Sequence, residues 1–77
     1  MAEINFTYFG TDTLIQCKNE DKLKDICEQY SIKLQKDINK LIFLYSGELL
    51  NLELKLKDVI NKMDKENLKM NILVYDN

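Results

Sequence analysis

The chain has 77 residues, the length of one small domain, and 45% of them are hydrophobic while 31% are charged, as in a folded globular protein. The formal net charge is -2, and every basic residue is a lysine, since arginine and histidine are both missing. This weakly acidic balance argues against nucleic-acid binding, which needs a basic face.

The chain holds no signal for a membrane or for secretion. No stretch of about 20 apolar residues occurs, so we expect no membrane span. The first residues lack the short apolar run of a signal peptide. Two cysteines, Cys17 and Cys27, are too few for a disulfide framework, and their spacing fits no zinc site. We therefore expect reduced thiols packed in the core of a cytoplasmic or nuclear protein, without metal or cofactor.

The first part of the chain predicts a β-hairpin. Ile4, Phe6 and Tyr8 alternate with polar residues, which is the period of a strand with one apolar face. The turn-forming residues 10–13 follow, and residues 13–17 then repeat the alternation. Two alternating runs joined by a short segment that contains glycine indicate two antiparallel strands.

One amphipathic helix is predicted after the hairpin. Asn19 and Asp21 are both good N-cap residues, and we expect the helix to begin at one of them. No glycine or proline marks its end, which we expect between Tyr30 and Leu34. Four apolar residues recur at the i, i+3, i+4, i+7 spacing of one helical stripe: Leu23, Ile26, Cys27 and Tyr30.

The next elements are short. Leu41 to Tyr45 form an apolar run with two aromatic residues, which we interpret as a buried central strand. Residues 46–48 predict a tight turn, and Leu49-Leu50 predict a short fourth strand. The alternating leucines of residues 52–56 either extend that strand or pack as an irregular segment.

The last part of the chain predicts a helical turn at residues 57–60, a charged loop at residues 62–69 and a final strand at residues 70–75. The whole order is strand, strand, helix, strand, short strand, strand. An α+β domain with a mixed sheet of four to five strands, and one helix packed across it, buries the single helical stripe most economically.

At this point the chain resembles the ubiquitin superfamily. Phe43-Leu44-Tyr45-Ser46-Gly47-Glu48-Leu49-Leu50, followed by Leu56-Lys57-Asp58, is similar to Leu-Ile-Phe-Ala-Gly-Lys-Gln-Leu and Leu-Ser-Asp of ubiquitin, and to Phe-Leu-Phe-x-Gly of small ubiquitin-like modifiers. The similarity covers nearly the whole chain. It implies a single ubiquitin-like β-grasp domain at residues 1–77, with the first and last strands parallel at the centre of the sheet. We expect this domain to be a module of a larger protein.

Two departures from the family pattern bear on function. Conjugated members end in Gly-Gly, whereas this chain ends Leu73-Val74-Tyr75-Asp76-Asn77, so the resemblance implies a non-conjugated domain. Glu48 stands where ubiquitin has its principal chain-forming lysine, which argues against polymer building at that position.

Side-chain alternation predicts an apolar patch on the helix-free face of the sheet. If Leu41 and Phe43 point into the core, then Ile42 and Leu44 point away from it. The same alternation in the last strand sends Leu73 and Tyr75 outward. A contiguous apolar patch on a small domain usually marks a binding surface.

The resemblance adds detail to this patch. Leu44 and Leu73 correspond to the isoleucine and the valine in ubiquitin's recognition patch, and Asn71 replaces the histidine beside it. Two other interpretations stay open, namely scattered surface residues and a one-residue error in register. The candidate protein-binding residues are Ile42, Leu44, Gly47, Asn71, Leu73 and Tyr75.

We expect a monomeric, non-catalytic protein that binds ubiquitin-pathway receptors or similar proteins, but neither nucleic acid nor membranes. Without histidine, no nucleophile–base pair of the usual kind is available, and two glycines are too few for a phosphate-binding loop. One alternative is a Ras-association-type domain, which would bind a small GTPase through the edge strand at residues 14–18. Another is a precursor fragment of a ubiquitin-like modifier.

Overall fold

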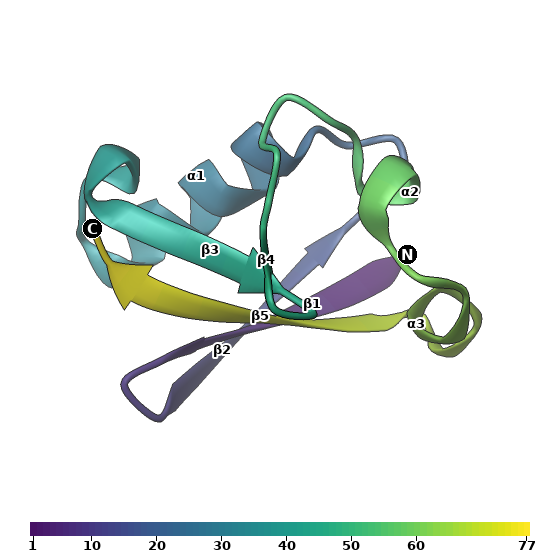
Figure 1. Cartoon of the computed structure of the whole chain (residues 1–77), viewed down its shortest axis with the longest axis horizontal. Helices are drawn as coiled ribbons and strands as arrows, with labels where there is room; N and C mark the ends of the chain where they lie inside the picture. Colours follow the sequence, from purple (N-terminus) through teal and green to yellow (C-terminus); the bar gives the residue numbers. More distant parts are fainter.

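Five strands form one mixed sheet, and a single long helix lies across one of its faces (Figure 1). The computed structural model describes all residues from 1 to 77. In chain order the elements are β1 (Ala2–Tyr8), β2 (Thr11–Cys17), α1 (Leu23–Leu34), the 3-10 helix η1 (Ile38–Lys40), β3 (Leu41–Tyr45), β4 (Glu48–Leu49), α2 (Leu56–Val59), α3 (Lys62–Asn67) and β5 (Lys69–Asp76).

The strand order is β2-β1-β5-β3-β4, so β5 is the central strand. β1 lies next to β5 and runs parallel to it. The hairpin partner β2 is antiparallel to β1, and β3 is antiparallel to β5. Figure 1 shows α1 behind this sheet, with α2 and α3 together at the end opposite the C-terminus. The expected parallel pairing of the first and last strands is therefore confirmed, as are the mixed sheet and the crossing helix.

The core lies between α1 and the sheet. All four residues of the predicted helical stripe are buried, as are the residues of β1 and β5 that face them. At its centre the ring of Phe6 stacks on that of Tyr30, with 4.3 Å between centroids and 9° between planes. Phe43 meets both rings edge-on, at 6.1 and 6.3 Å. These three aromatic side chains join β1, α1 and β3, because each comes from a different element.

The hydroxyl of Tyr30 is buried without a hydrogen-bond partner. Burial raises the pKa of this hydroxyl above its usual value. An unsatisfied buried polar group costs about 1 kcal/mol or more. We therefore expect Tyr30→Phe to raise the free energy of unfolding by about 1 kcal/mol, measured by urea denaturation. A lower midpoint for this variant would show that the hydroxyl has a stabilising partner.

The start of α1 differs from the prediction. Neither Asn19 nor Asp21 caps the helix; the N-cap is Lys22, whose side chain makes no capping bond. The Asp21 carboxylate instead accepts a hydrogen bond from the backbone N–H of Lys18, at 2.9 Å. Asp21 therefore closes the turn between β2 and α1.

The first N–H groups of α1 are satisfied by a segment far away in sequence. Leu23 and Lys24 donate to the backbone carbonyls of Leu54 and Leu52, both at 2.9 Å. Since these carbonyls fill the place of an N-cap side chain, the helix needs no local cap. Leu52 and Leu54 thus belong to an irregular segment that packs on the helix, and they do not extend β4. Leu56 is the first residue of α2.

A second correction concerns residues 62–69, which we predicted to be a charged loop. Most of this segment is the helix α3, which begins after the N-cap Asn61 and ends at Asn67. The C-cap Leu68 has a left-handed conformation. The Asn61 side chain accepts from the N–H of Asp64, at 2.8 Å. Two smaller differences are shifts of one residue, which place α2 at Leu56–Val59 and β4 at Glu48–Leu49.

Candidate protein-binding face

The predicted apolar residues lie opposite one another on β3 and β5. Ile42 pairs with Tyr75, and Leu44 pairs with Leu73. Leu73 and Tyr75 are 46% and 47% exposed, while Ile42 and Leu44 are half-buried on the same side of the sheet. The residues between them, such as Phe43, are buried under α1. The alternation argument is therefore confirmed, and the interpretation as a register error is wrong.

Leu49 extends the apolar surface and is missing from the sequence prediction. It pairs with Leu44 across β3 and β4, and it is 72% exposed. A two-residue turn after Tyr45 brings Leu49 opposite Leu44, so hairpin pairing across this turn is the signal that finds it. We call the resulting surface the apolar patch; it consists of Ile42, Leu44, Leu49, Leu73 and Tyr75.

Gly47 supports the patch through the backbone. Ser46 and Gly47 both have positive φ, 52° and 81°, which a two-residue turn of type I′ requires. Gly47 adopts this conformation without the steric cost of a side chain. Its contribution is thus the tight turn that returns the chain alongside β3.

Asn71 lies at the margin of the patch, because the β3–β5 pairing ends with Leu44 and Leu73. Beyond this pair the surface is hollowed by a depression of about 480 Å³, lined by strand residues and by Asn61 and Asp64 near the start of α3. Asn71 is exposed and lines the same hollow. The structure therefore brings the candidate residues together at one face, with Asn71 and Gly47 at its edge.

The wall of this hollow is held by Tyr45. Its hydroxyl donates to the Asp64 carboxylate, at 2.5 Å, and accepts from the backbone N–H of Asn61, at 3.1 Å. Burial and the neighbouring Asp64 carboxylate both raise the pKa of Tyr45. These bonds attach the start of α3 to the end of β3, beside the patch.

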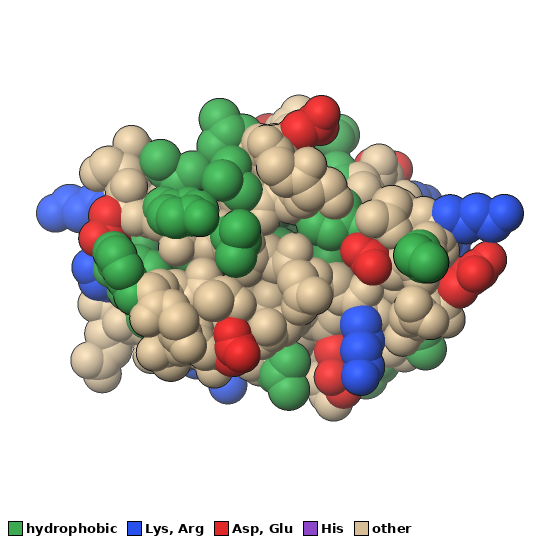
Figure 2. Space-filling model, turned by 60° about the horizontal axis from the view of Figure 1, so that its bottom comes forward, with side chains coloured by type: hydrophobic (Ala, Val, Ile, Leu, Met, Phe, Trp, Pro, Cys, Tyr) green, Lys and Arg blue, Asp and Glu red, His purple; other side chains and the backbone are tan.

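The helix-free face carries few charges. Among the strand residues whose side chains lie on it, only Glu3, Asp12 and Lys69 carry a formal charge at neutral pH. Glu3 and Lys69 are neighbours at the start of β1 and β5, away from the patch. Figure 2 shows apolar side chains gathered in the upper left of the view, with charged side chains below them, to their right and at the outer edge. Depletion of charge, more than apolar area, distinguishes the centre of a protein interface from other surface.

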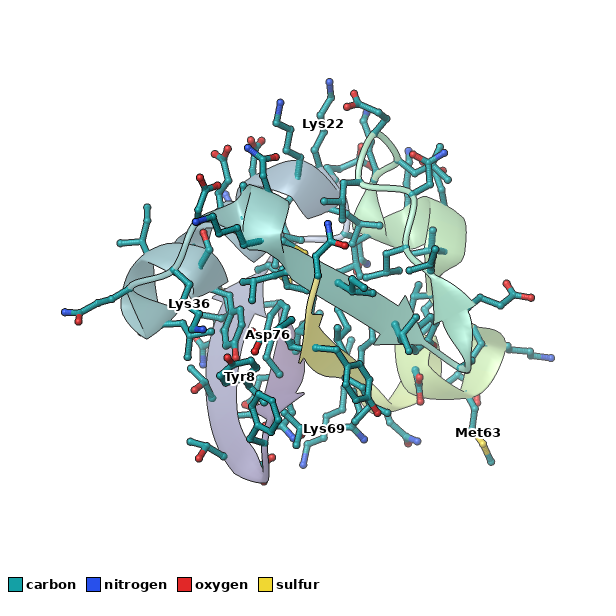
Figure 3. The ribbon with its side chains drawn as sticks, turned by 60° about the vertical axis from the view of Figure 1, so that its left-hand side comes forward. Tyr8, Lys22, Lys36, Met63, Lys69 and Asp76 are labelled. Atoms are coloured by element: carbon teal, nitrogen blue, oxygen red, sulfur yellow. The ribbon has the colours of Figure 1, made fainter.

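Two polar networks outside the patch hold elements of the fold together. In the first, the hydroxyl of Tyr8 donates to Asp76 at 2.7 Å, and the ammonium of Lys36 lies 3.5 Å from the same carboxylate (Figure 3). Lys36 also stands 5.3 Å above the ring of Tyr8. The hydrogen bond from Tyr8 is the main reason why the pKa of Asp76 is lowered. This network fastens the end of β5 to β1 and to the segment that follows α1.

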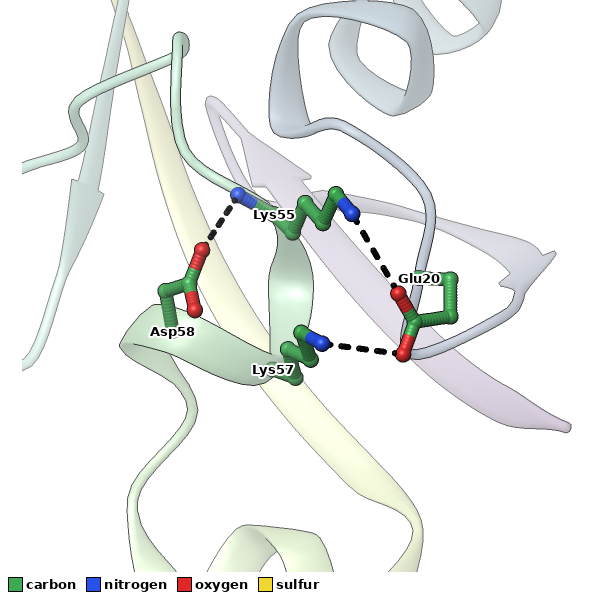
Figure 4. A network of polar contacts seen from close by, with 4 residues as sticks. All are labelled: Glu20, Lys55, Lys57 and Asp58. Atoms are coloured by element: carbon green, nitrogen blue, oxygen red, sulfur yellow. Dashed lines mark hydrogen bonds and ion pairs between the residues drawn. The ribbon is translucent and has the colours of Figure 1, made fainter.

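In the second network, Glu20 accepts from the ammonium groups of Lys57 at 3.0 Å and Lys55 at 3.4 Å (Figure 4). These contacts lower the pKa of Glu20, with Lys57 making the larger contribution. The backbone N–H of Lys55 donates to Asp58 at 3.1 Å. Glu20 thus holds the start of α2 against the turn before α1, while Asp58 caps the first turn of α2.

Both cysteines are free and buried. Burial raises the pKa of Cys17 to about 11 and that of Cys27 to about 12. Since the thiolate is the reactive form, both thiols act as packing groups near neutral pH. The structure contains no group of three metal-ligating side chains within reach of one ion. None of its helices has the length and apolar composition of a membrane-spanning segment.

No protein-family model matches the chain, and neither does any curated protein sequence. The geometry of the helix-free face therefore carries the functional argument.

Proposed function

We propose that the chain is a non-catalytic, ubiquitin-like β-grasp module that binds other proteins through the apolar patch. One observation carries the proposal: two cross-strand pairs, Ile42 with Tyr75 and Leu44 with Leu73, form a continuous apolar surface on a face with few charges. The parallel central strands and the crossing helix agree with the fold that the resemblance implies. We further propose the cytoplasm or nucleus as its compartment, because both thiols are free.

The proposed partner presents an apolar surface with a basic margin. Leucine and tyrosine side chains that lose water on contact supply most of the binding energy in such interfaces. One acidic residue stands near the patch, namely Asp64, which lines the hollow. Lysine or arginine on the partner complements this carboxylate and favours the correct orientation. Ubiquitin-pathway receptors or proteins of similar surface chemistry are the proposed class.

The test compares binding by the native chain with binding by Leu44→Ala, Leu73→Ala and the double variant. Each chain is immobilised, the retained proteins are identified, and each one is then purified and titrated against the native chain by calorimetry. Loss of a central interface residue typically costs about 2 kcal/mol, or about 30-fold in affinity. We expect losses of this size for the single variants and no measurable binding for the double variant.

Ile32→Ala is the matched control, because Ile32 is 75% exposed on α1, away from the patch. Surface substitutions of this kind change stability by about 0.5 kcal/mol or less, so every variant is checked by thermal unfolding. If the folded double variant binds the same proteins as tightly as the native chain does, the apolar patch is not the binding surface.

A further inference from the structure

The two edges of the sheet differ in length. β4 forms one edge and has two residues, whereas β2 forms the other and has seven. β2 pairs only with β1, and Figure 1 shows it at the margin of the sheet. The backbone groups on its outer side are therefore free to pair with another strand.

The pairing of β1 determines which residues of β2 face outward. The N–H of Glu3 donates to the carbonyl of Leu68, just before β5, so odd-numbered residues of β1 bond toward β5. Even-numbered residues of β1 then bond toward β2, where their partners, such as Ile15 opposite Ile4, are odd-numbered. The outward N–H and C=O groups of β2 consequently belong to Asp12, Leu14 and Gln16.

This edge lacks the features that usually prevent strand pairing. Residues 11–17 contain no proline and no lysine, and the register against β1 is unbroken from Ala2–Cys17 to Tyr8–Thr11, so no bulge is present. The one charge within the strand is that of Asp12. Leu14 lies in the middle of the strand and is 59% exposed. The row of free backbone groups ends after Gln16, because the N–H of Lys18 donates to the Asp21 carboxylate.

We propose that β2 pairs with β2 of a second copy of this chain, antiparallel and in a register centred on Leu14. Only outward-facing residues can exchange hydrogen bonds, so Leu14 stands opposite Leu14 of the second copy, and Asp12 stands opposite Gln16. This register overlaps the whole strand. It places no like charges opposite each other, and it covers the exposed leucine with its own counterpart.

Self-association of this kind goes beyond the binding of partners through the apolar patch. The two sheets join into one, and the two-fold axis perpendicular to it leaves both apolar patches on the same side. A single pair of strands buries a small area, so the dimer is weak. We expect a dissociation constant of about 0.1 mM. Two patches on one side increase the avidity for a partner with two docking surfaces.

Sedimentation equilibrium and amide NMR over about 0.01 to 1 mM test the proposal. We expect the average mass to rise toward that of a dimer as concentration increases. We also expect the amide signals of Asp12, Leu14 and Gln16 to shift with concentration, while those of Leu44 and Leu73 stay constant.

Leu14→Lys is the decisive variant, because it brings two ammonium groups opposite each other at the centre of the register. We expect it to remain monomeric at every concentration. Ile32→Lys makes the same charge change at an exposed site on α1 and is expected to associate as the native chain does. A native chain that stays monomeric, a Leu14→Lys variant that still associates, or concentration shifts confined to the apolar patch would each overturn the proposal.

Discussion

Phe6→Ala is expected to lower the free energy of unfolding by about 3–5 kcal/mol, the usual cost of deleting a buried aromatic side chain. Phe6 is fully buried, stacks on Tyr30 and meets Phe43 edge-on. Its removal leaves a cavity between β1, α1 and β3, and these elements cannot all move inward to fill it. A loss of this size approaches the whole stability of a small domain.

Chemical denaturation followed by circular dichroism measures this effect. The matched control is Phe9→Ala, because Phe9 is 76% exposed in the turn after β1, where its ring meets that of Tyr8 edge-on. We expect the control to change stability by less than about 1 kcal/mol. If Phe6→Ala unfolds too readily to measure, Phe6→Leu replaces it. We expect Phe6→Leu to lower the free energy of unfolding as well, by about 1–2 kcal/mol. Equal effects at Phe6 and Phe9 would contradict the aromatic core described above.

Leu56→Ala is expected to destabilise the chain by about 2–5 kcal/mol. Leu56 opens α2 and is fully buried, and its N–H donates to the carbonyl of Asp21 at 2.9 Å. Its side chain closes one end of the core. Truncation therefore loses apolar burial and leaves a cavity where no backbone can move in.

Leu54→Ala is the matched control for this change, since Leu54 lies two residues earlier and is 38% exposed. We expect Leu54→Ala to lower the free energy of unfolding by about 1 kcal/mol or less. The midpoint of urea unfolding measures both variants. A larger loss at Leu54 than at Leu56 would mean that the segment between β4 and α2 packs differently.

Much of the fold follows from local periodicity. The alternation at Ile4 and Phe6, and again at Met70 and Ile72, predicts strands because successive side chains in a strand point to opposite faces. The stripe from Leu23 to Tyr30 predicts a helix for the corresponding reason, at a period of 3.6 residues. These patterns identify their elements because each strand or helix buries one face, whatever it packs against.

Helix ends and the third helix were harder to predict. α1 begins where the carbonyls of Leu52 and Leu54 meet it, and no residue near its start signals this contact. α3 has no apolar stripe, and its stability depends on the Asn61 cap and on Tyr45, a residue from a distant strand. Asn61 alone was a usable signal, but five of the six residues after it are charged or polar, and they favour a loop equally well.

The candidate site, too, depends partly on local periodicity and partly on contacts between distant residues. Alternation along the chain sends Leu44 and Leu73 outward, but it does not state which strands are neighbours. The resemblance assigned Leu44 and Leu73 to one patch, and the structure shows the pairing of β3 with β5 that brings them together. Leu49 was missed because its position depends on the turn at Ser46 and Gly47 and on the pairing that follows.

For β1, β3, β5 and α1, the sequence by itself determined which residues are buried and which are exposed, because that choice depends on side chains only a few positions apart. Tertiary structure alone decided that Ile42 and Leu44 meet Tyr75 and Leu73, and that Leu14 stands on an open edge. These features depend on contacts between residues far apart in the chain, and such contacts form only when the whole core closes.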